Sequence, residues 1–229
     1  PVRVGEDAVE QHELDLAMET AAAKRYNEAI ALARDAGDNG TRELCERFLK
    51  DLPEDRYLPE VPFVAGESQF WLKNYGDAEQ LYRRLLTSFG DKSDDANKAR
   101  LRLAWTLYFQ KNYDAAQAPL TRIEASADPA IRAEALYLTG NCLFELRKDD
   151  EALKSLTEYL GGAAESKQAR PYVDDALYKV ALIHVRQDRP GQAVEPLAKL
   201  IAEHGDSSLR LQSEYQLAEV YYQQRNYAK

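Results

Sequence analysis

The sequence contains four stretches that follow one internal pattern, in which a small residue is followed twelve positions later by an alanine. The pairs are Gly66 with Ala78, Ala104 with Ala116, Gly140 with Ala152, and Ala181 with Ala193. The spacing inside each unit is constant, whereas the small residues of successive units lie 38, 36 and 41 positions apart. Two packed helices joined by a tight turn need a fixed register, while a surface connector tolerates insertions. The repeat therefore predicts a stack of helical hairpins.

Apolar residues around these small positions recur with the period of a helix rather than that of a strand. In the second repeat, Leu103 and Leu107 mark the first helix of the hairpin, and Leu120 lies on the second helix. Asp128 before Pro129 has the form of a helix N-cap followed by a proline at the first helical position. We therefore expect an all-α fold without strands.

Local features of these helices carry three structural expectations. Pro119 and Pro196 each lie three residues after the alanine of a second helix, so both helices should start late or bend there. The pair Gly161–Gly162 should stop a helix rather than hold a phosphate. Cys45 and Cys142 should be unpaired, because about five helices separate them and packed helices are spaced ~8 to 10 Å.

No constellation for catalysis or metal binding is found. The histidines, His12, His184 and His204, have no acidic or cysteine ligand at metal spacing. A nucleophile motif of the GxSxG type is absent. The carboxylate pairs Asp149–Asp150 and Asp174–Asp175 fall in first helical turns, where the helix dipole accounts for them. We expect no catalytic residue, no metal and no cofactor.

The charge balance restricts the partners. The chain has 30 Lys and Arg against 39 Asp and Glu, a net charge of -9. Without a local basic stripe, such a chain repels a phosphate backbone. No apolar window is long enough to span a bilayer. We expect neither a nucleic-acid partner nor membrane insertion.

Each repeat has a small residue, then an aromatic, then a turn such as KNY, and then an alanine with a large apolar residue four positions later. This pattern resembles that of the tetratricopeptide repeat family. The resemblance covers the chain from about Leu58 to Lys229. It implies a right-handed α-solenoid of antiparallel helical hairpins. The connectors are similar to the longer-period type of bacterial envelope proteins, among them the outer-membrane assembly lipoprotein and the Tol-associated periplasmic protein. That similarity implies a bacterial periplasm or cell-envelope location rather than the cytoplasm.

The resemblance implies one continuous solenoid over residues 1–229. Its expected parts are a leading or capping helix at 6–23, hairpins at 28–52, 58–88, 94–126, 129–160 and 171–204, and the first helix of a further repeat at 207–229. Before Leu58 two registers compete. One aligns Leu32, Leu44 and Phe48 with the repeat and gives these boundaries, and the other aligns Ala17, Tyr26 and Ala29.

The C-terminal end carries its own expectation. The chain opens at Pro1 and stops where the earlier repeats turn into their second helix, so we expect a fragment of a longer array. The last helix would then have an apolar face without cover, formed by Tyr215, Leu217, Val220 and Tyr221. A solenoid needs a polar cap at such an end, so this face should meet a second copy or the missing residues.

The family resemblance further implies a concave groove lined by the first helices, with the residue three before each small position pointing into it. The expected partner-binding residues are Phe63, Phe70, Trp71, Trp105, Tyr108, Tyr137, Asn141, Phe144, Tyr178, Tyr215 and Tyr222. Aromatic side chains with a polar tip give large contact area at low entropy cost. Each of them could instead pack between helices.

Charged residues are expected at the rim of this groove. The rim is acidic, with Lys98 as the exception: Glu60, Glu67, Glu134, Asp175 and Glu219. Lys98, Asn141 and Arg186 are scattered candidates for holding a C-terminal carboxylate, as some family members do.

These observations lead to a functional hypothesis. The chain is interpreted as a non-catalytic protein-protein interaction scaffold that holds a peptide or partner segment in a concave aromatic groove. Two alternatives stay open, a structural module that self-associates through its C-terminal helix and a regulatory segment of a larger enzyme.

Overall fold

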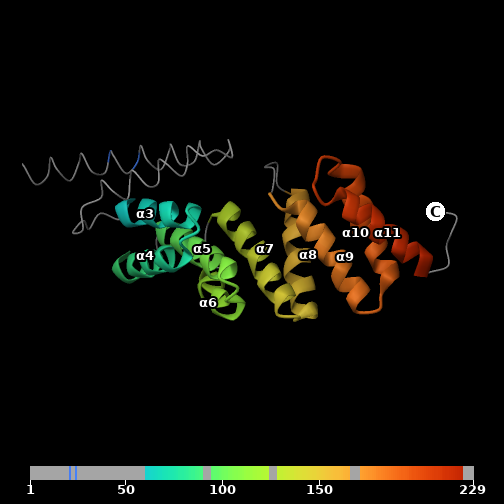
Figure 1. The fold of residues 1–229 in the computed structure, drawn as a ribbon, viewed down its shortest axis with the longest axis horizontal. Coiled ribbons are helices and arrows are strands. Elements are labelled where there is room, and N and C mark those ends of the chain that lie inside the picture. Colours follow the sequence, from blue (N-terminus) through green and yellow to red (C-terminus); the bar gives the residue numbers. More distant parts are fainter. Residues whose placement is uncertain are drawn as a thin grey trace, which may run out of the picture. The chain divides into compact units, whose positions relative to one another are not determined.

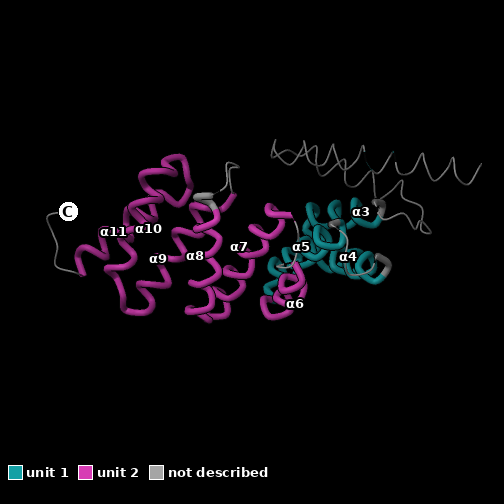
Figure 2. The backbone as a smooth tube through the Cα atoms, turned by 180° about the vertical axis from the view of Figure 1, so that it is seen from behind, with its two compact units in different colours: residues 1–112 teal, residues 113–229 magenta. Residues whose placement is uncertain are grey.

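The computed structural model describes residues 60–89, 94–123, 128–165 and 171–223, together with Ala21 and Lys24. The described residues are helical and contain no strand, so the all-α prediction is confirmed for them. They fall into two compact units, residues 1–112 and 113–229 (Figure 2). Apart from Ala21 and Lys24, the leading helix expected at 6–23 and the hairpin expected at 28–52 lie outside the described residues. A single continuous solenoid stays a prediction.

The first unit contains three described helices, α3 (Glu60–Trp71), α4 (Tyr75–Phe89) and α5 (Asp94–Phe109). Each packs on the next along the chain, and α5 also lies against α3. The first helices of two successive repeats are therefore neighbours.

The second unit continues the same pattern (Figure 1). Its described helices are α6 (Tyr113–Ile123), α7 (Pro129–Glu145), α8 (Asp149–Glu165), α9 (Val173–Arg186), α10 (Pro190–Glu203) and α11 (Arg210–Gln223). Each packs on the next, and α9 also lies against α7. A buried cluster joins α9, α10 and α11 through Ala181, Ala193, Leu197 and Val220.

The small residues of the repeat mark points of closest approach between helices. A Cβ atom added to Gly66 would lie 2.7 Å from the Tyr82 ring, and one added to Gly140 would lie 2.6 Å from the Leu156 side chain. The alanines twelve positions later, Ala78, Ala116, Ala152 and Ala193, are all fully buried. The fixed spacing in the sequence is therefore a packing requirement.

The turn between the two helices of each hairpin has one recurring geometry. Seven residues after each small position, the backbone is left-handed, with φ of 63° at Lys73, 62° at Lys111, 60° at Arg147 and 56° at Asp188. At Lys111 the backbone N–H donates to the Tyr108 carbonyl at 2.9 Å, and the next N–H, of Asn112, donates to Leu107 at 2.8 Å. These two bonds define a Schellman helix end. The same pair of bonds occurs at the other three turns.

Two predictions about helix ends can be compared with the structure. Helices α6 and α10 do not start late, because they begin at Tyr113 and Pro190 and contain Pro119 and Pro196 in their interior, while the alternative that both bend at these residues stays a prediction. Helix α8 does not stop at Gly161 but continues to Glu165. In each case buried side chains of the same helix pack on its neighbours, and this tertiary packing outweighs the local preference. The N-cap prediction is confirmed, since Asp128 Oδ1 accepts from the backbone N–H of Ala130 at 2.8 Å.

Candidate functional site

Four of the five predicted residues of the first unit gather in one aromatic cluster. Phe70, Trp105 and Tyr108 contact Phe109, whose ring centroid is 5.6 Å from that of Phe70 and 5.8 Å from that of Trp105. Trp71 joins the cluster through its edge-on contact with Phe70. Phe70 and Trp105 are buried, whereas Phe109 is 46% exposed. Most of this aromatic surface is therefore used in packing α3 against α5.

Phe63, the fifth predicted residue of this unit, lies apart from the cluster. Its ring packs edge-on against Tyr82 of α4, with 6.1 Å between the centroids. It is half-buried in the hairpin formed by α3 and α4.

Glu67 does not belong to the groove rim, which corrects the sequence-based expectation. It is 5% exposed, and its Oε1 accepts from the Tyr82 hydroxyl at 2.5 Å and pairs with Arg102 Nε at 3.0 Å. Burial, followed by the neighbouring Glu67 charge, raises the pKa of Tyr82 well above its ordinary value. The carboxylate thus ties together α3, α4 and α5.

In the second unit, Tyr137, Asn141 and Phe144 lie on one side of α7, next to α9. Tyr137 is 5% exposed, and its hydroxyl donates to Asp175 Oδ2 at 2.7 Å. Its ring stacks on Tyr172 with 4.5 Å between centroids and 7° between planes. Tyr172 has a left-handed φ of 71°, which is strained for a bulky residue. Tyr137 therefore acts as a packing residue between α7 and α9.

Two cations of α9 lie over the aromatic rings of α7. Lys179 Nζ is 5.9 Å from the ring centroids of both Tyr137 and Phe144, and it donates to Asp175 at 2.7 Å. The Arg186 guanidinium carbon is 4.2 Å above Phe144, and the guanidinium also pairs with Asp149 at the start of α8. Sequence analysis did not connect Lys179 with these rings, although a seven-residue spacing from Arg186 placed both on one helix face.

Asn141 is 1% exposed, and its Oδ1 has no hydrogen-bond partner among the described residues. A buried acceptor without a donor costs about 1 to 3 kcal/mol. The atom lies on α7 in the same row as Tyr137 and Phe144, four residues after the first and three before the second.

The exposed aromatic residues of the predicted set lie at the C-terminal end. Tyr215 is 69% exposed and Tyr222 is 66% exposed, and the neighbouring Leu211 is 77% exposed. Tyr178 is half-buried against the cluster of α9, α10 and α11. The expectation that Leu217 and Val220 lack cover was wrong, because Val220 is fully buried in that cluster and Leu217 packs on it. The open face of α11 is the one that carries Leu211, Tyr215 and Tyr222.

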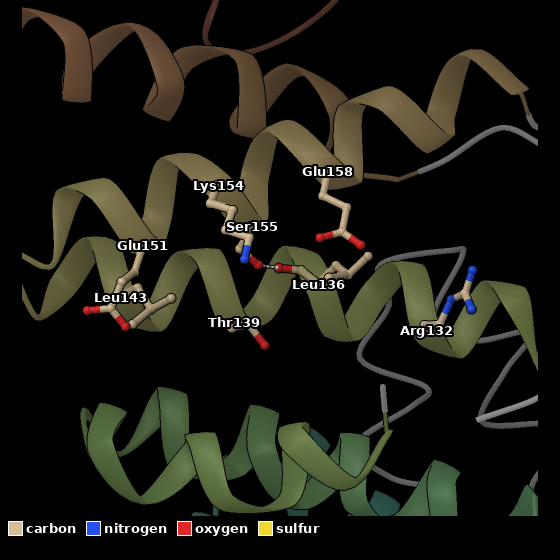
Figure 3. Close-up of a pocket in the computed structure, with 8 residues that line it drawn as sticks. All are labelled: Arg132, Leu136, Thr139, Leu143, Glu151, Lys154, Ser155 and Glu158. Carbon is tan, nitrogen blue, oxygen red and sulfur yellow. Dashed lines mark hydrogen bonds between the residues drawn. The ribbon is translucent and has the colours of Figure 1, made fainter. Parts of the chain in front are cut away.

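A pocket of about 490 Å³ lies between α7 and α8 (Figure 3). It is lined by Arg132, Leu136, Thr139, Leu143, Glu151, Lys154, Ser155 and Glu158. The Ser155 hydroxyl donates to the Leu136 carbonyl at 2.8 Å and so closes one wall. The pocket has two acidic and two basic side chains at its edges and contains none of the residues predicted to bind a partner.

The described residues show no group of His, Cys, Asp and Glu side chains that could hold a metal ion. Cys142 is a free, buried thiol, and burial raises its pKa to about 12. Burial lowers the pKa of His184, whose Nδ1 has no hydrogen-bond partner in the described segments. A helix long and apolar enough to cross a membrane is not found in the part of the chain that the structure describes.

Comparisons with family models support the repeat architecture. Residues 62–159 match the model of anaphase-promoting complex, cyclosome, subunit 3, and residues 175–207 match a tetratricopeptide repeat model. Residues 1–57 match the model of the ferritin-like domain. A search of curated proteins gave no match.

Solved structures with a similar fold include MamA and YrrB. MamA from Desulfovibrio magneticus RS-1 is 19% identical with a TM-score of 0.62, over 81% of this chain and 97% of that one. A second MamA structure is 17% identical with a TM-score of 0.61, over 74% and 84% of the two chains. YrrB, a TPR protein with an unusual peptide-binding site, is 19% identical with a TM-score of 0.59, over 83% and 90%. At this identity the likeness concerns the fold alone.

The stacked hairpins, the buried small residues at their crossings and the recurring turns define a helical-repeat protein of the solenoid class. The family matches over 62–159 and 175–207 support the tetratricopeptide repeat family for these parts of the chain. The resemblance stated from the sequence is thus confirmed at the level of the family, while the relation to bacterial envelope proteins stays a prediction.

Proposed function

We propose that this chain is a non-catalytic scaffold that binds a segment of another protein along its first helices, with Tyr215 and Tyr222 of α11 as the main contact residues. Proteins of this repeat fold serve as protein-interaction scaffolds and are generally not enzymes. YrrB, with a similar fold, has a peptide-binding site, which supports an extended or helical segment as the bound element.

The exposure of the aromatic residues on α11 carries this proposal. Of the predicted binding residues, Tyr215 and Tyr222 are the two with more than half of the side chain exposed, and Leu211 extends the same face. Soluble monomers rarely leave a contiguous apolar face open unless it is used for binding. Tyrosine is also enriched among the residues that dominate interface energies.

The remaining predicted residues have a supporting role in this proposal. Phe70 and Trp105 are buried in the first unit, and Tyr137 and Asn141 are buried in the second, so each pair packs helices of its own unit. Phe63, Trp71, Tyr108, Phe144 and Tyr178 are half-buried and contribute only their outer edges.

Self-assembly is the second candidate, and the same observation favours it. Leu211 is 77% exposed, and an apolar helix face at one end of a repeat array can also bury itself against a second copy. Such an interface would involve Leu211, Tyr215 and Tyr222, so the two candidates differ in their partner rather than in their residues. A bacterial-envelope location remains part of the proposal.

Selection of peptides from a displayed random library against the full chain tests the proposal. Selected peptides should lose ~1 to 3 kcal/mol of binding free energy when Tyr215→Ala or Tyr222→Ala is introduced. The control is Lys199→Ala, an exposed residue of the second helix α10 and so outside the tyrosine face of α11, which should leave affinity unchanged.

Two further results would decide between the candidates. Peptides that bind all three variants equally would contradict the assignment of Tyr215 and Tyr222. Sedimentation velocity of the chain alone should show a monomer if the scaffold is correct. A dimer that Tyr215→Ala abolishes, without any selected peptide, would favour self-assembly.

A further inference from the structure

The pocket between α7 and α8 has four charged side chains around it. They are Glu151, Lys154 and Glu158 of α8 and Arg132 of α7, and all four are exposed. None of them forms an ion pair or a hydrogen bond with another described residue. Figure 3 shows their order along the two helices, which is Glu151, Lys154, Glu158 and then Arg132. This charge row therefore alternates in sign, from an acid at one end to a base at the other.

The lack of ion pairs distinguishes the charge row from the charged residues at the contact between α8 and α9. Asp149, at the start of α8, pairs with Arg186 of α9. Lys179 of α9 pairs with the acid four residues earlier on its own helix, at 2.7 Å. Lys154 has an acid three residues before it and another four residues after it, yet it pairs with neither. The charges of the row thus remain available to a partner.

The charge row is complementary to itself when it is turned end to end. In one direction its signs are negative, positive, negative and positive, and in the other direction every sign is reversed. A second copy that runs antiparallel to the first therefore places Lys154 opposite Glu158 and Glu151 opposite Arg132, and each of these pairs occurs twice. Such reciprocal pairing is the property of an interface with two-fold symmetry.

The spacing along the helices allows all of these pairs to form together. The central base and acid lie two residues on either side of position 156, which places the two-fold axis there. Glu151 is five residues from this position, about 7.5 Å along the helix. The hydrogen bond from Ser155 to Leu136 sets α7 level with α8, and Arg132 lies four residues beyond Leu136, hence about 4.5 Å from the axis. A long arginine side chain spans the difference of about 3 Å.

We propose that two copies of this chain associate through the charge row, related by a two-fold axis that lies across α7 and α8. The inference goes beyond the scaffold function, because it uses a surface of α7 and α8 and leaves the tyrosine face of α11 free. The self-assembly candidate described above, in contrast, uses Leu211, Tyr215 and Tyr222. The two interfaces therefore respond to different substitutions.

Other occupants fit the charge row less well. An apolar helix would bury four charges without partners, which is unfavourable. A copy in parallel register would place acid on acid and base on base, and such like-charge contacts are repulsive. A different protein would need the same alternating order of charges, which a second copy already carries.

The expected dimer is weak and sensitive to salt. Exposed ion pairs contribute little individually and are screened by ions, so affinity depends on the pairs forming together. The dimer should appear in low-salt buffer as the chain concentration approaches ~1 mM, and it should dissociate in high salt. At micromolar concentration the chain stays a monomer, so the dimer is compatible with peptide binding by a monomeric scaffold.

Sedimentation equilibrium of the full chain from ~10 μM to ~1 mM in low salt measures this association. Lys154→Glu and Glu158→Lys should each lower the association constant at least ~10-fold, because each turns two attractive pairs into repulsive ones. The matched controls are Lys199→Glu and Glu195→Lys, which make the same changes of net charge at exposed positions of α10. They should keep the association constant within ~3-fold of the wild type.

Mixing the two row variants is the decisive experiment. In a pair of one Lys154→Glu chain and one Glu158→Lys chain, every position of the row again faces the opposite charge. Fluorescence-detected sedimentation of one dye-labelled variant with an excess of the other should therefore recover at least the wild-type association constant. Circular dichroism of each variant checks that the fold is intact, as expected for exposed positions.

Several results would overturn the inference. These are a chain that stays monomeric up to ~1 mM in low salt, equal association of the wild type and Lys154→Glu, and a mixture that associates no more tightly than either variant alone. A dimer that Tyr215→Ala abolishes and Lys154→Glu does not would assign the association to α11 and overturn it as well. Failure of the charge row leaves the scaffold function standing if selected peptides depend on Tyr215 and Tyr222.

Discussion

Replacing Lys111 with glycine is expected to stabilise the protein, although it removes a whole side chain. Lys111 ends α5 in a left-handed conformation with φ of 62°. A residue with a Cβ atom pays about 1 to 2 kcal/mol for this conformation. Glycine avoids that cost but loses about 0.5 to 1 kcal/mol through its freedom in the unfolded chain. The net expectation is a gain of about 0.5 to 1 kcal/mol in the free energy of unfolding.

The structure indicates that little else changes at this turn. The Lys111 side chain is exposed, and the two hydrogen bonds that close the turn are made by backbone N–H groups. Both bonds are available to glycine. Urea unfolding followed by circular dichroism at the helix band measures the shift in midpoint, and an unchanged slope shows that the same surface is exposed on unfolding.

Asn112→Gly is the matched control. Asn112 is adjacent and exposed, and its φ is not left-handed, so glycine should only add unfolded-state freedom and destabilise by about 0.5 to 1 kcal/mol. The equivalent turns at Lys73, Arg147 and Asp188 should respond like Lys111, and a four-fold glycine variant should gain about 2 to 4 kcal/mol because distant sites add. If Lys111→Gly destabilises as much as Asn112→Gly, the argument from the left-handed turn is refuted.

Three further predictions follow from buried groups. Gly140→Ala should destabilise the protein by about 1 to 3 kcal/mol, because the added Cβ atom would lie 2.6 Å from a leucine side chain of α8. Gly161→Ala, with open space around the added atom, should stabilise it by about 0.5 to 1 kcal/mol. Thermal melts that rank the two variants in the opposite order would contradict the packing. Glu67→Ala should cost about 3 kcal/mol or more, because it removes the buried carboxylate that accepts from the Tyr82 hydroxyl and pairs with Arg102. Glu79→Ala, which removes a more exposed ion pair, should cost at most about 0.5 kcal/mol. Similar denaturant midpoints for the two variants would refute the network. Burial raises the pKa of the Cys142 thiol from its ordinary 9.0 to about 12, so the contribution of this thiol to stability is complete below pH 9 and is lost as the pH rises toward 12. The free energy of unfolding should therefore fall more steeply with pH in the wild type than in Cys142→Ala. Parallel curves for the two proteins would contradict the burial of the thiol.

The fold was predictable because its strongest constraint is local in the sequence. Gly66 and Gly140 are small because a second helix leaves no room for a Cβ atom, and this requirement recurs with each hairpin. The N-cap at Asp128 was predictable for a similar reason, since it depends only on its own first turn. The prolines inside α6 and α10 were not, because packing of the neighbouring buried residues decides whether a helix continues through such a residue.

The sequence predicts the register of the candidate residues along their helices but not their exposure. Tyr137 and Tyr215 occupy the same register, yet one is 5% and the other 69% exposed, because a following first helix covers only the former in the described structure. The same holds for Glu67, which is buried, and Glu219, which is half-buried. Sequence analysis missed Lys179 because its contacts are with distant residues. The rings that it approaches belong to Tyr137, 42 positions earlier, and Phe144, 35 positions earlier, and no local pattern encodes such a contact.

Hydroxyl-radical footprinting of the tyrosines tests the central claim most directly, because it reports side-chain exposure in the free and bound chain. In the free chain, Tyr215 and Tyr222 should be oxidised fast, while Tyr82 and Tyr137 should be protected. With a library-selected peptide bound, Tyr215 and Tyr222 should become protected and the buried pair should not change. Equal oxidation of Tyr137 and Tyr215 in the free chain, or bound ligand that leaves Tyr215 and Tyr222 fully reactive, would contradict the account.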